Sequence, residues 1–276
     1  MRKMRKWIIA AILICGMTTV LTSCSDSDDD PAPQPDLNVA EKILGKWMLA
    51  ELDGQACPTN LKAVITFMSS TKAYGSLSDF YSDSWNNHVS ADVVISGNKV
   101  TLTAFENERT KHITETTISS ITDKDMLLGS DWKVFIDGIQ VINEVYAKER
   151  YIRVTDNYED AIIGMWEGKV TSSEDEHSDG ELHRWEYKAD GTYVYYSKVD
   201  GLWKASTDVM ADYFVDGTLL CTRWKKTAAS EELREWWEIE SIKDDVMKWT
   251  ALRMREDGST YTATFQMTRV SLPYSR

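Results

Sequence analysis

An internal repeat constrains the fold of this 276-residue chain more than any other feature of its sequence. The pattern N-x-x-[ED]-x-I-[LI]-G-x-W occurs at 38–47 and again at 157–166, an offset of 119 residues. Further matches in the same order are 97–102 with 216–221, at the same offset, and 118–126 with 239–247, at an offset of 121. Three colinear matches indicate a tandem duplication. We therefore expect two domains of one fold, spanning 38–155 and 156–276.

Each repeat opens with residues that favour a short helical turn. Asn38 and Asn157 can act as N-caps, and an acidic residue follows each of them three positions later, Glu41 in the first repeat and Asp160 in the second. This spacing is that of a capping box. We expect one helical turn at the start of each repeat and almost no helix after it.

The rest of each repeat alternates between apolar and polar residues, which predicts β-strands. In the second repeat the eight strand candidates are about 163–171, 181–188, 191–198, 209–215, 218–225, 234–242, 246–255 and 259–270. Asp190-Gly191, Asp216-Gly217 and Asp257-Gly258 are strong hairpin signals, because a type I′ turn needs φ > 0 at both central residues. Lys243-Asp244-Asp245 is a weaker one. Eight antiparallel strands must protect their two edges, so we predict an all-β chain of two tandem eight-stranded up-and-down barrels.

The first predicted strand of each repeat begins with the same short motif, Gly45-x-Trp47 and Gly164-x-Trp166. This motif resembles the G-x-W signature of lipocalins and their bacterial lipocalin-like relatives. The segment Trp185–Tyr193 looks like the F-x-x-D-G-T-Y segment of those relatives. The resemblance implies calycin-type barrels, and Arg269 is the nearest candidate for the last-strand arginine that packs on the family tryptophan. The repeats are shorter than typical lipocalins, which puts a roomy ligand cavity in doubt.

The N-terminus has the features of an export signal. Met1–Lys6 carries four cations and no acid, and Trp7–Leu21 is an uncharged, mostly apolar run of 15 residues. Such a run is short for a membrane span, which takes about 20 residues, but suits a signal peptide. It ends in Leu21-Thr22-Ser23-Cys24, which resembles the bacterial lipobox. The resemblance implies a lipoprotein signal peptide at 1–23 and an anchor of acyl chains, palmitate among them, on Cys24; the alternative is a plain secretory signal cleaved elsewhere.

The segment 24–37 is expected to be a disordered tether. Ser25–Asp30 is acidic, and prolines alternate with other residues over Pro31–Pro35, a composition that cannot pack. Acidic residues directly after a lipidated cysteine resemble the export signal of surface lipoproteins in some Gram-negative bacteria. We therefore expect an outer-membrane lipoprotein that faces the cell exterior. The alternative is that the acids serve only to keep the tether solvated.

The charge of the mature chain excludes one class of partner. The whole chain has a formal net charge of −13, and removing a signal peptide with four cations and no acid leaves −17. Nucleic acid needs a basic footprint on the protein, so a nucleic-acid partner is not expected. Over most of the surface the same charge disfavours an anionic ligand.

No pattern in the chain indicates catalysis or a cofactor. The four histidines, His88, His112, His177 and His183, have no compact metal-binding spacing, and the chain has no Gly-rich phosphate loop and no G-x-S-x-G. His177 stands in an acidic run, 174–179, which is either a weak site for a hard cation or simply a solvated loop. We predict a protein that is not an enzyme and that holds no metal or cofactor.

Two cysteines follow the predicted lipid anchor, one in each repeat. Export makes a disulfide between Cys57 and Cys221 chemically feasible. Cys221 matches Leu102 of the first repeat, which we interpret as an inward apolar position of a strand. This favours buried thiols, with the inter-repeat bridge as the alternative.

Tryptophan is concentrated in the second repeat, which holds seven: Trp166, Trp185, Trp203, Trp224, Trp236, Trp237 and Trp249. If Cys221 and Trp237 point inward, strand alternation places Trp224 and Trp236 side by side on the outer face. Paired aromatic residues there can bind a glycan or a protein partner. The alternative is that this face packs against the first repeat, across a linker (155–161) too short for free tumbling.

The remaining aromatic residues are expected inside the second barrel. The inward candidates are Trp185, Tyr187, Tyr193, Tyr195, Trp237, Trp249, Tyr261, Phe265 and Met267. They either fill the barrel or line a pocket for a mostly apolar molecule. The candidate ligand-binding residues are Tyr193, Tyr195, Trp224, Trp236, Trp237 and Trp249.

These observations favour a lipid-anchored, non-enzymatic binding protein whose ligand is a small apolar molecule or a glycan. The alternative is a structural or interaction protein with solid barrels, such as an accessory subunit or inhibitor of a surface complex. Fold alone does not separate the two, because barrels of this kind host unrelated functions.

Overall fold

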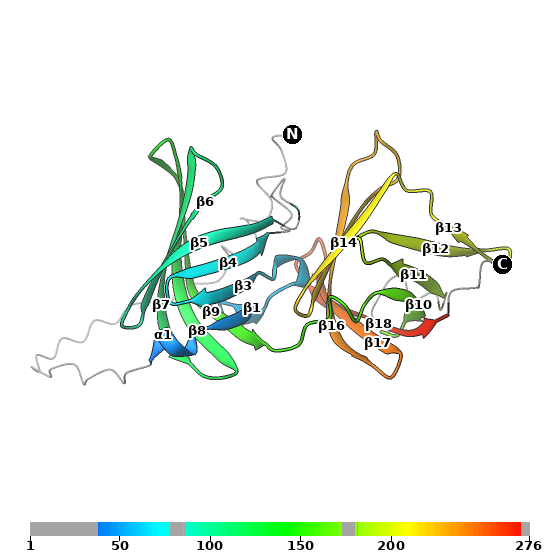
Figure 1. Ribbon diagram of the computed structural model, residues 1–276, viewed down its shortest axis with the longest axis horizontal. Coiled ribbons are helices and arrows are strands. Elements are labelled where there is room, and N and C mark those ends of the chain that lie inside the picture. The colour runs from blue at the N-terminus through cyan, green and yellow to red at the C-terminus, as the bar shows by residue number, and fades with distance from the viewer. Residues whose placement is uncertain (1–37, 78–84, 86, 173–179, 181, 272–276) are drawn as a thin grey trace, which may run out of the picture.

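The computed structural model shows an all-β protein of two antiparallel sheets that lie side by side (Figure 1). The residues that it describes are 38–77, 85, 87–172, 180 and 182–271. The predicted signal peptide, Cys24 and the tether lie outside the described residues. So do His177 and the whole acidic run 174–179.

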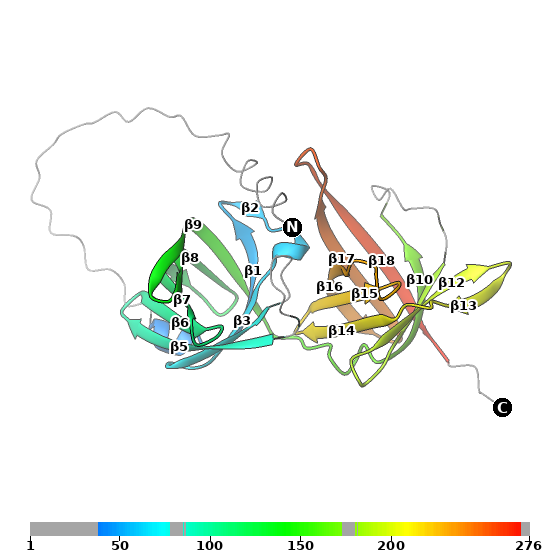
Figure 2. The same ribbon diagram turned by 90° about the horizontal axis from the view of Figure 1, so that it is seen from above.

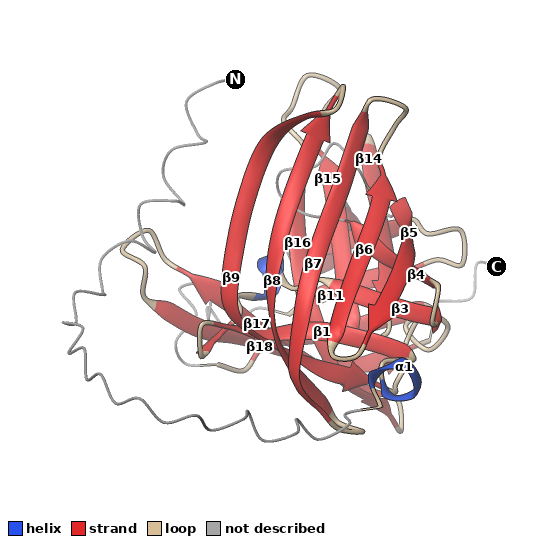
Figure 3. Ribbon diagram, turned by 90° about the vertical axis from the view of Figure 1, so that its left-hand side faces the viewer, coloured by secondary structure: helices blue, strands red, loops and turns tan. Residues whose placement is uncertain are grey.

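The first sheet is a closed barrel of eight strands, and a short ninth strand, β2 (Gln55–Ala56), pairs with the end of β1 (Gly45–Leu52). Its elements are α1 (Val39–Lys42), β1 (Gly45–Leu52), β2 (Gln55–Ala56), the 3₁₀ helix η2 (Thr59–Leu61), β3 (Val64–Ser69), β4 (Lys72–Leu77), β5 (Asn87–Ser96), β6 (Lys99–Phe105), β7 (Thr110–Ile121), β8 (Asp125–Ile136) and β9 (Ile139–Val154). Neighbours in sequence pair from β3 to β9, β1 pairs with β3, and β1 also pairs with β9, which closes the barrel. β7, β8 and β9 are the longest strands and run past the others at one end (Figure 3).

The second sheet is curled into a half-barrel. Its strands are β10 (Gly164–Val170), β11 (His183–Tyr187), β12 (Tyr193–Val199), β13 (Leu202–Ala205), β14 (Met210–Asp216), β15 (Leu219–Lys225), β16 (Leu233–Lys243), β17 (Val246–Met254) and β18 (Thr260–Val270). The order runs from β13 through β12, β11, β10, β18, β17, β16 and β15 to β14. A single bridge, Thr192 with Asp212, connects β12 to β14 across the open side.

All eight strands predicted for the second repeat are present, so the all-β barrel architecture is confirmed. The first sheet closes as predicted, whereas the second has a ninth strand, β13, and open edges. β13 follows the turn Asp200-Gly201, where φ is +53° and +79° as a type I′ hairpin requires. This Asp-Gly pair is the sequence signal that predicts the extra strand.

The predicted hairpins form, but the type of turn differs from expectation. At Asp190-Gly191, Asp216-Gly217 and Asp257-Gly258 only the glycine has a positive φ, so these are not type I′ turns. At Asp244-Asp245, which we expected to be the weaker hairpin signal, both residues have a positive φ. A single glycine is sufficient for other tight turns, because it reaches positive φ without steric cost.

The start of each repeat also differs in part from the capping-box prediction. α1 is a single helical turn, and Asn38 has φ +43° with no side-chain hydrogen bond to a backbone N–H. Its side-chain amide instead donates to the Glu41 carboxylate at 2.5 Å. In the second repeat the equivalent segment, 158–161, contains turn residues rather than a helix.

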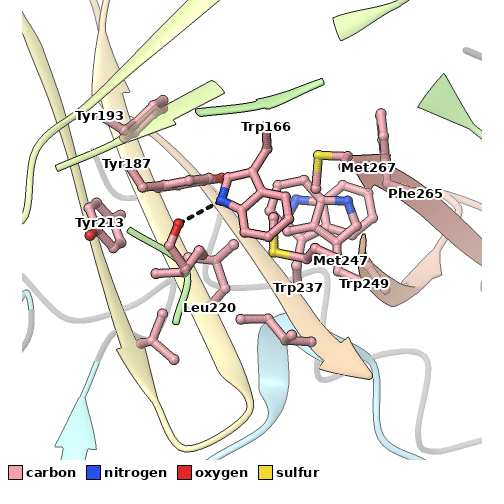
Figure 4. Close-up of a cluster of buried hydrophobic side chains, with 14 of the residues drawn as sticks. Trp166, Tyr187, Tyr193, Tyr213, Leu220, Trp237, Met247, Trp249, Phe265 and Met267 are labelled. Carbon is pink, nitrogen blue, oxygen red and sulfur yellow. Dashed lines mark hydrogen bonds between the residues drawn. The ribbon is translucent and has the colours of Figure 1, made fainter. Parts of the chain in front are cut away.

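The G-x-W motif of the second repeat joins the two ends of the chain segment that forms the sheet. Trp166 is fully buried, and its indole N–H donates to the Ile162 carbonyl at 2.7 Å (Figure 4). The Arg269 guanidinium lies 4.2 Å from the Trp166 ring and donates to the carbonyls of Ile163 and Ala161 at 2.6 and 2.8 Å. Arg269 therefore occupies the place of the last-strand arginine that the resemblance implies.

The first repeat has the same arrangement. The Trp47 indole donates to the Ile43 carbonyl at 2.7 Å, and the Arg153 guanidinium lies 4.1 Å from the Trp47 ring. In the second repeat, the glycine that begins the motif has two physical reasons. A Cβ at Gly164 would lie 2.4 Å from Nη1 of Arg269, and the φ of +130° at this position is one that residues with a side chain rarely adopt. The barrel-like sheets and these paired contacts are compatible with a lipocalin-like fold.

The two sheets share an apolar cluster, so the outer face of β14–β16 is not a free surface. Met48 and Val64 of the first sheet pack with Phe214, Cys221 and Trp236 of the second. Figure 2 shows β1 and β3 on the side of the first sheet that faces the second sheet. This confirms the alternative in which the face packs against the first repeat. Polar contacts surround the cluster: the Lys46–Asp216 and Lys62–Glu238 ion pairs, and the Leu252 N–H donating to Thr59 at 2.8 Å.

The contact between the sheets corrects the orientation predicted for β15. Cys221 is fully buried on the outer face, against the first sheet, and not inside the barrel. Cys57 and Cys221 are both buried thiols and are not joined by a disulfide, so the alternative of a bridge between the repeats is wrong. Burial raises the pKa of the Cys57 thiol to about 11.

Candidate functional site

The second sheet encloses a cavity of about 690 Å³. Its walls come from β10, β11, β12, β15, β16, β17 and β18, and from the segment 205–208 that connects the two open edges of the sheet. Ala205, Thr207 and Lys226 line the cavity and are exposed to solvent. The mouth therefore lies on the open side of the half-barrel, between β13 and β14.

Aromatic rings form the inner part of the cavity. Trp185 is at their centre, with its ring centroid 5.4 Å from those of Tyr195, Trp249 and Phe265. Trp237 stacks on Trp249 at 5.3 Å, with 19° between the ring planes. These rings come from five strands and pack mainly edge to face, which holds the wall in one arrangement.

The structure brings most of the predicted binding residues together. Those that line the cavity are Tyr193, Tyr195, Trp224, Trp237 and Trp249. The prediction that Trp224 lies on the outer face is wrong, because Leu220 pairs with Trp237 in the interior and Trp224 shares the face of Leu220. Trp236 does face outward, but it is 5% exposed and belongs to the cluster between the sheets.

His183 is a cavity residue that the sequence analysis did not select. Its Nδ1 lies 2.9 Å from the Tyr195 hydroxyl, whereas its Nε2 is buried without a hydrogen-bond partner. The Tyr187 hydroxyl and the Trp249 indole nitrogen are also buried without a partner. Strand alternation with Trp185 on β11 is the signal that places His183 and Tyr187 inside.

A charged pair lies on the cavity wall beside the aromatic rings. Arg253 donates to the Glu235 carboxylate at 2.9 Å and lies 4.5 Å from the Trp237 ring. Glu235 also accepts a hydrogen bond from the Trp237 indole at 3.4 Å. Asp208 and Lys226 are the other charged lining residues, so the formal charges of the wall cancel.

Two tyrosines of the cavity, Tyr187 and Tyr193, stay in the neutral hydroxyl form. Burial is the main cause that raises the pKa of Tyr187 and of Tyr193 above the ordinary value. A neutral hydroxyl can both donate and accept a hydrogen bond. These side chains therefore offer polar contacts without adding charge to the wall.

The interior of the first barrel is nearly filled. It has a cavity of only about 60 Å³, lined mainly by aliphatic side chains. Glu149 lines this space and accepts hydrogen bonds from Ser130 and Tyr151. Burial raises the pKa of the Glu149 carboxyl above its ordinary value. A space of this size accommodates water molecules, each of which takes about 30 Å³, but no larger ligand.

Two further features were checked over the part of the chain that the structure describes. No group of three or more His, Cys, Asp or Glu side chains is arranged to hold a metal ion. Among the same residues, no helix has the length and apolar character needed to cross a membrane.

Comparison with known proteins adds little to this picture. No protein-family model matches the chain, and no curated protein matches it. Among solved structures, the chain is similar to a protein of unknown function from the DUF3598 family of Nostoc punctiforme PCC 73102. The two are 8% identical, the match covers 85% of this chain and 99% of that one, and the TM-score is 0.26. A similarity this slight carries no argument about fold or function.

Proposed function

We propose that this protein is a lipid-anchored, non-enzymatic binding protein of the outer membrane, facing the cell exterior, whose second domain holds a small molecule. The cavity of about 690 Å³ carries the proposal. Its volume falls in the range of about 300–1,000 Å³ that is typical of small-molecule sites. The first domain is a closed barrel with an interior space of only about 60 Å³, so the larger cavity belongs to the open half-barrel of the second domain.

The polar groups of the cavity support binding rather than catalysis. His183 is engaged with the Tyr195 hydroxyl, and Glu235 is engaged with Arg253. A nucleophilic or acid–base mechanism needs a reactive group paired with a base and aimed at the substrate. Two serines, Ser197 and Ser206, are among the described lining residues, but His183 is hydrogen-bonded to Tyr195 and Ser206 to Asp208, which suits a role in positioning a ligand.

Native mass spectrometry of the unlipidated mature chain (24–276 with Cys24→Ala) tests the binding function. We expect a bound small molecule of defined mass, and we expect its release to change tryptophan fluorescence, because four tryptophans line the cavity. Organic extraction then identifies it. An apo mass, with no fluorescence response to fatty acids, indole or saccharides, would contradict the proposal and favour an accessory or inhibitory protein with a protein partner.

The anchor is tested separately by Cys24→Ala in the full-length chain. A residue with several acyl chains is held durably in a membrane, since each buried CH₂ contributes about 0.8 kcal/mol. We expect the wild type to incorporate labelled palmitate, to fractionate with the outer membrane and to be cleaved by protease added to whole cells. The variant should lose the label and appear in the soluble fraction. A wild type that is soluble and unlabelled would show a plain secretory signal instead.

A further inference from the structure

The chemistry of the cavity wall identifies a class of ligand. Among the residues that the structure describes, twenty line the cavity: ten carry aromatic or imidazole rings, and eight others carry hydroxyl or charged groups. Val170 and Ala205 are the two aliphatic ones. The wall thus combines flat ring faces with hydrogen-bonding groups and offers almost no aliphatic surface.

On this basis, and resting on the binding function proposed above, we propose that the ligand is a neutral saccharide. A pyranose ring has two faces of C–H groups, whose slight positive charge suits the negative faces of aromatic rings. Its edges carry hydroxyls that both donate and accept hydrogen bonds. Both requirements meet where Glu235 and Arg253 adjoin the ring of Trp237, in the cavity that Trp185 and Trp224 also line.

The Glu235–Arg253 pair is suited to hydroxyl groups. The carboxylate accepts and the guanidinium donates, and their side chains are 39% and 29% exposed, so both retain free hydrogen-bonding positions. Hydrogen bonds to a charged partner are about twice as strong as those between neutral groups. Two neighbouring hydroxyls of one sugar can therefore bind the pair together, one donating to Glu235 and the other accepting from Arg253.

The absence of net charge on the wall favours a neutral ligand. Asp208 and Glu235 are balanced by Lys226 and Arg253. An anionic ligand would need a cation that no wall carboxylate offsets, and the protein as a whole carries excess negative charge. The wall is therefore matched to a polar ligand without formal charge.

Other small-molecule classes fit the same wall less well. A fatty acid would place its chain against aliphatic side chains, which are nearly absent. A flat aromatic molecule without hydroxyls would bury the polar wall groups without partners, which is costly. The unpartnered polar atoms of His183, Tyr187 and Trp249 add to that cost, and saccharide oxygens that reach them would reduce it.

The first experiment compares ligand classes on one protein. The unlipidated mature chain is applied to an array of neutral and acidic oligosaccharides, and tryptophan fluorescence is titrated with array hits, with laurate and with indole. We expect saturable binding of neutral saccharides only. Binding of laurate or indole without any saccharide would overturn the saccharide class but keep the binding function. No response to any of the three classes would overturn both.

Variants then place the saccharide in the cavity. Trp224→Ala removes a partly buried ring from the wall, and Trp203→Ala is the matched control, a partly buried tryptophan of the same domain outside the cavity. Glu235→Gln keeps the shape but loses the charge. We expect Trp224→Ala and Glu235→Gln to weaken saccharide binding about tenfold or more, and the control to bind normally. Unchanged affinity in both, with native circular dichroism, would place the sugar elsewhere and overturn the proposal.

Discussion

Replacing Trp166 by alanine is expected to lower the free energy of unfolding by about 3–5 kcal/mol, the usual cost of deleting a buried tryptophan. The side chain is fully buried at the base of the second core, next to Tyr187, Met247 and Met267 (Figure 4). Its loss leaves a cavity, removes the hydrogen bond to Ile162 and takes away the ring on which Arg269 lies. Thermal unfolding followed by circular dichroism measures the change, with an expected fall in Tm of about 6–20 °C for a chain of this size.

Two further variants make this result specific to the motif. Trp47→Ala should have a similar cost, because Trp47 is fully buried in the first barrel and makes the equivalent bond to Ile43. Trp203→Ala should cost less than about 1 kcal/mol, since Trp203 is partly exposed on β13 and contacts Arg184. If Trp166→Ala and Trp203→Ala were equally mild, the contact between the G-x-W tryptophan and the last-strand arginine would not stabilise the fold.

Much of this architecture could be predicted from the sequence because its signals are local. Alternation with period two locates strands, and Asp-Gly pairs locate the hairpins that connect them. The Asp200-Gly201 pair carries the same signal, so β13 could also be predicted. The open side of the second sheet could not be predicted, because whether two distant edges pair depends on tertiary contacts that local patterns do not encode.

The orientation of β15 shows where strand alternation is insufficient. Leu219 and Cys221 alternate with Leu220, and all three are apolar and buried. Leu220 packs inside the half-barrel, whereas Leu219 and Cys221 pack against the first sheet. A strand that is buried on both faces has no polar face that identifies the solvent side. Its alternation therefore shows which residues share a face, but not which face points into the half-barrel; we call this choice the phase of the strand. The misplacement of Trp224 follows from this ambiguity.

The cavity was harder to predict than the residues around it. Tyr193, Tyr195, Trp237 and Trp249 could be placed inside from alternation alone. The volume they leave empty depends on how the rings pack against one another, as Trp185 does with Trp249 and Phe265. The shortness of the repeats suggested little space, yet a sheet that stays open on one side encloses more volume than its length implies.

Trp236→Ala and Trp224→Ala are expected to have opposite consequences, although the two residues lie on paired strands. Trp236 is 5% exposed between the two sheets, where it packs with Met48, Phe214 and Cys221. Its removal should cost about 3–5 kcal/mol and weaken the contact between the domains, so that a single calorimetric transition separates into two. Ligand binding should persist at temperatures below the first transition.

Trp224 reverses this pattern because it faces the cavity and is only partly buried. Trp224→Ala should lower the free energy of unfolding by less than about 1.5 kcal/mol, keep one calorimetric transition and lose affinity for the cavity ligand. The comparison tests the phase of β15 and β16 directly, since the opposite phase would exchange the two phenotypes. If Trp224→Ala split the transition while Trp236→Ala abolished binding, β15 and β16 would present their opposite faces to the cavity, and the site would have to be rebuilt from the outer face.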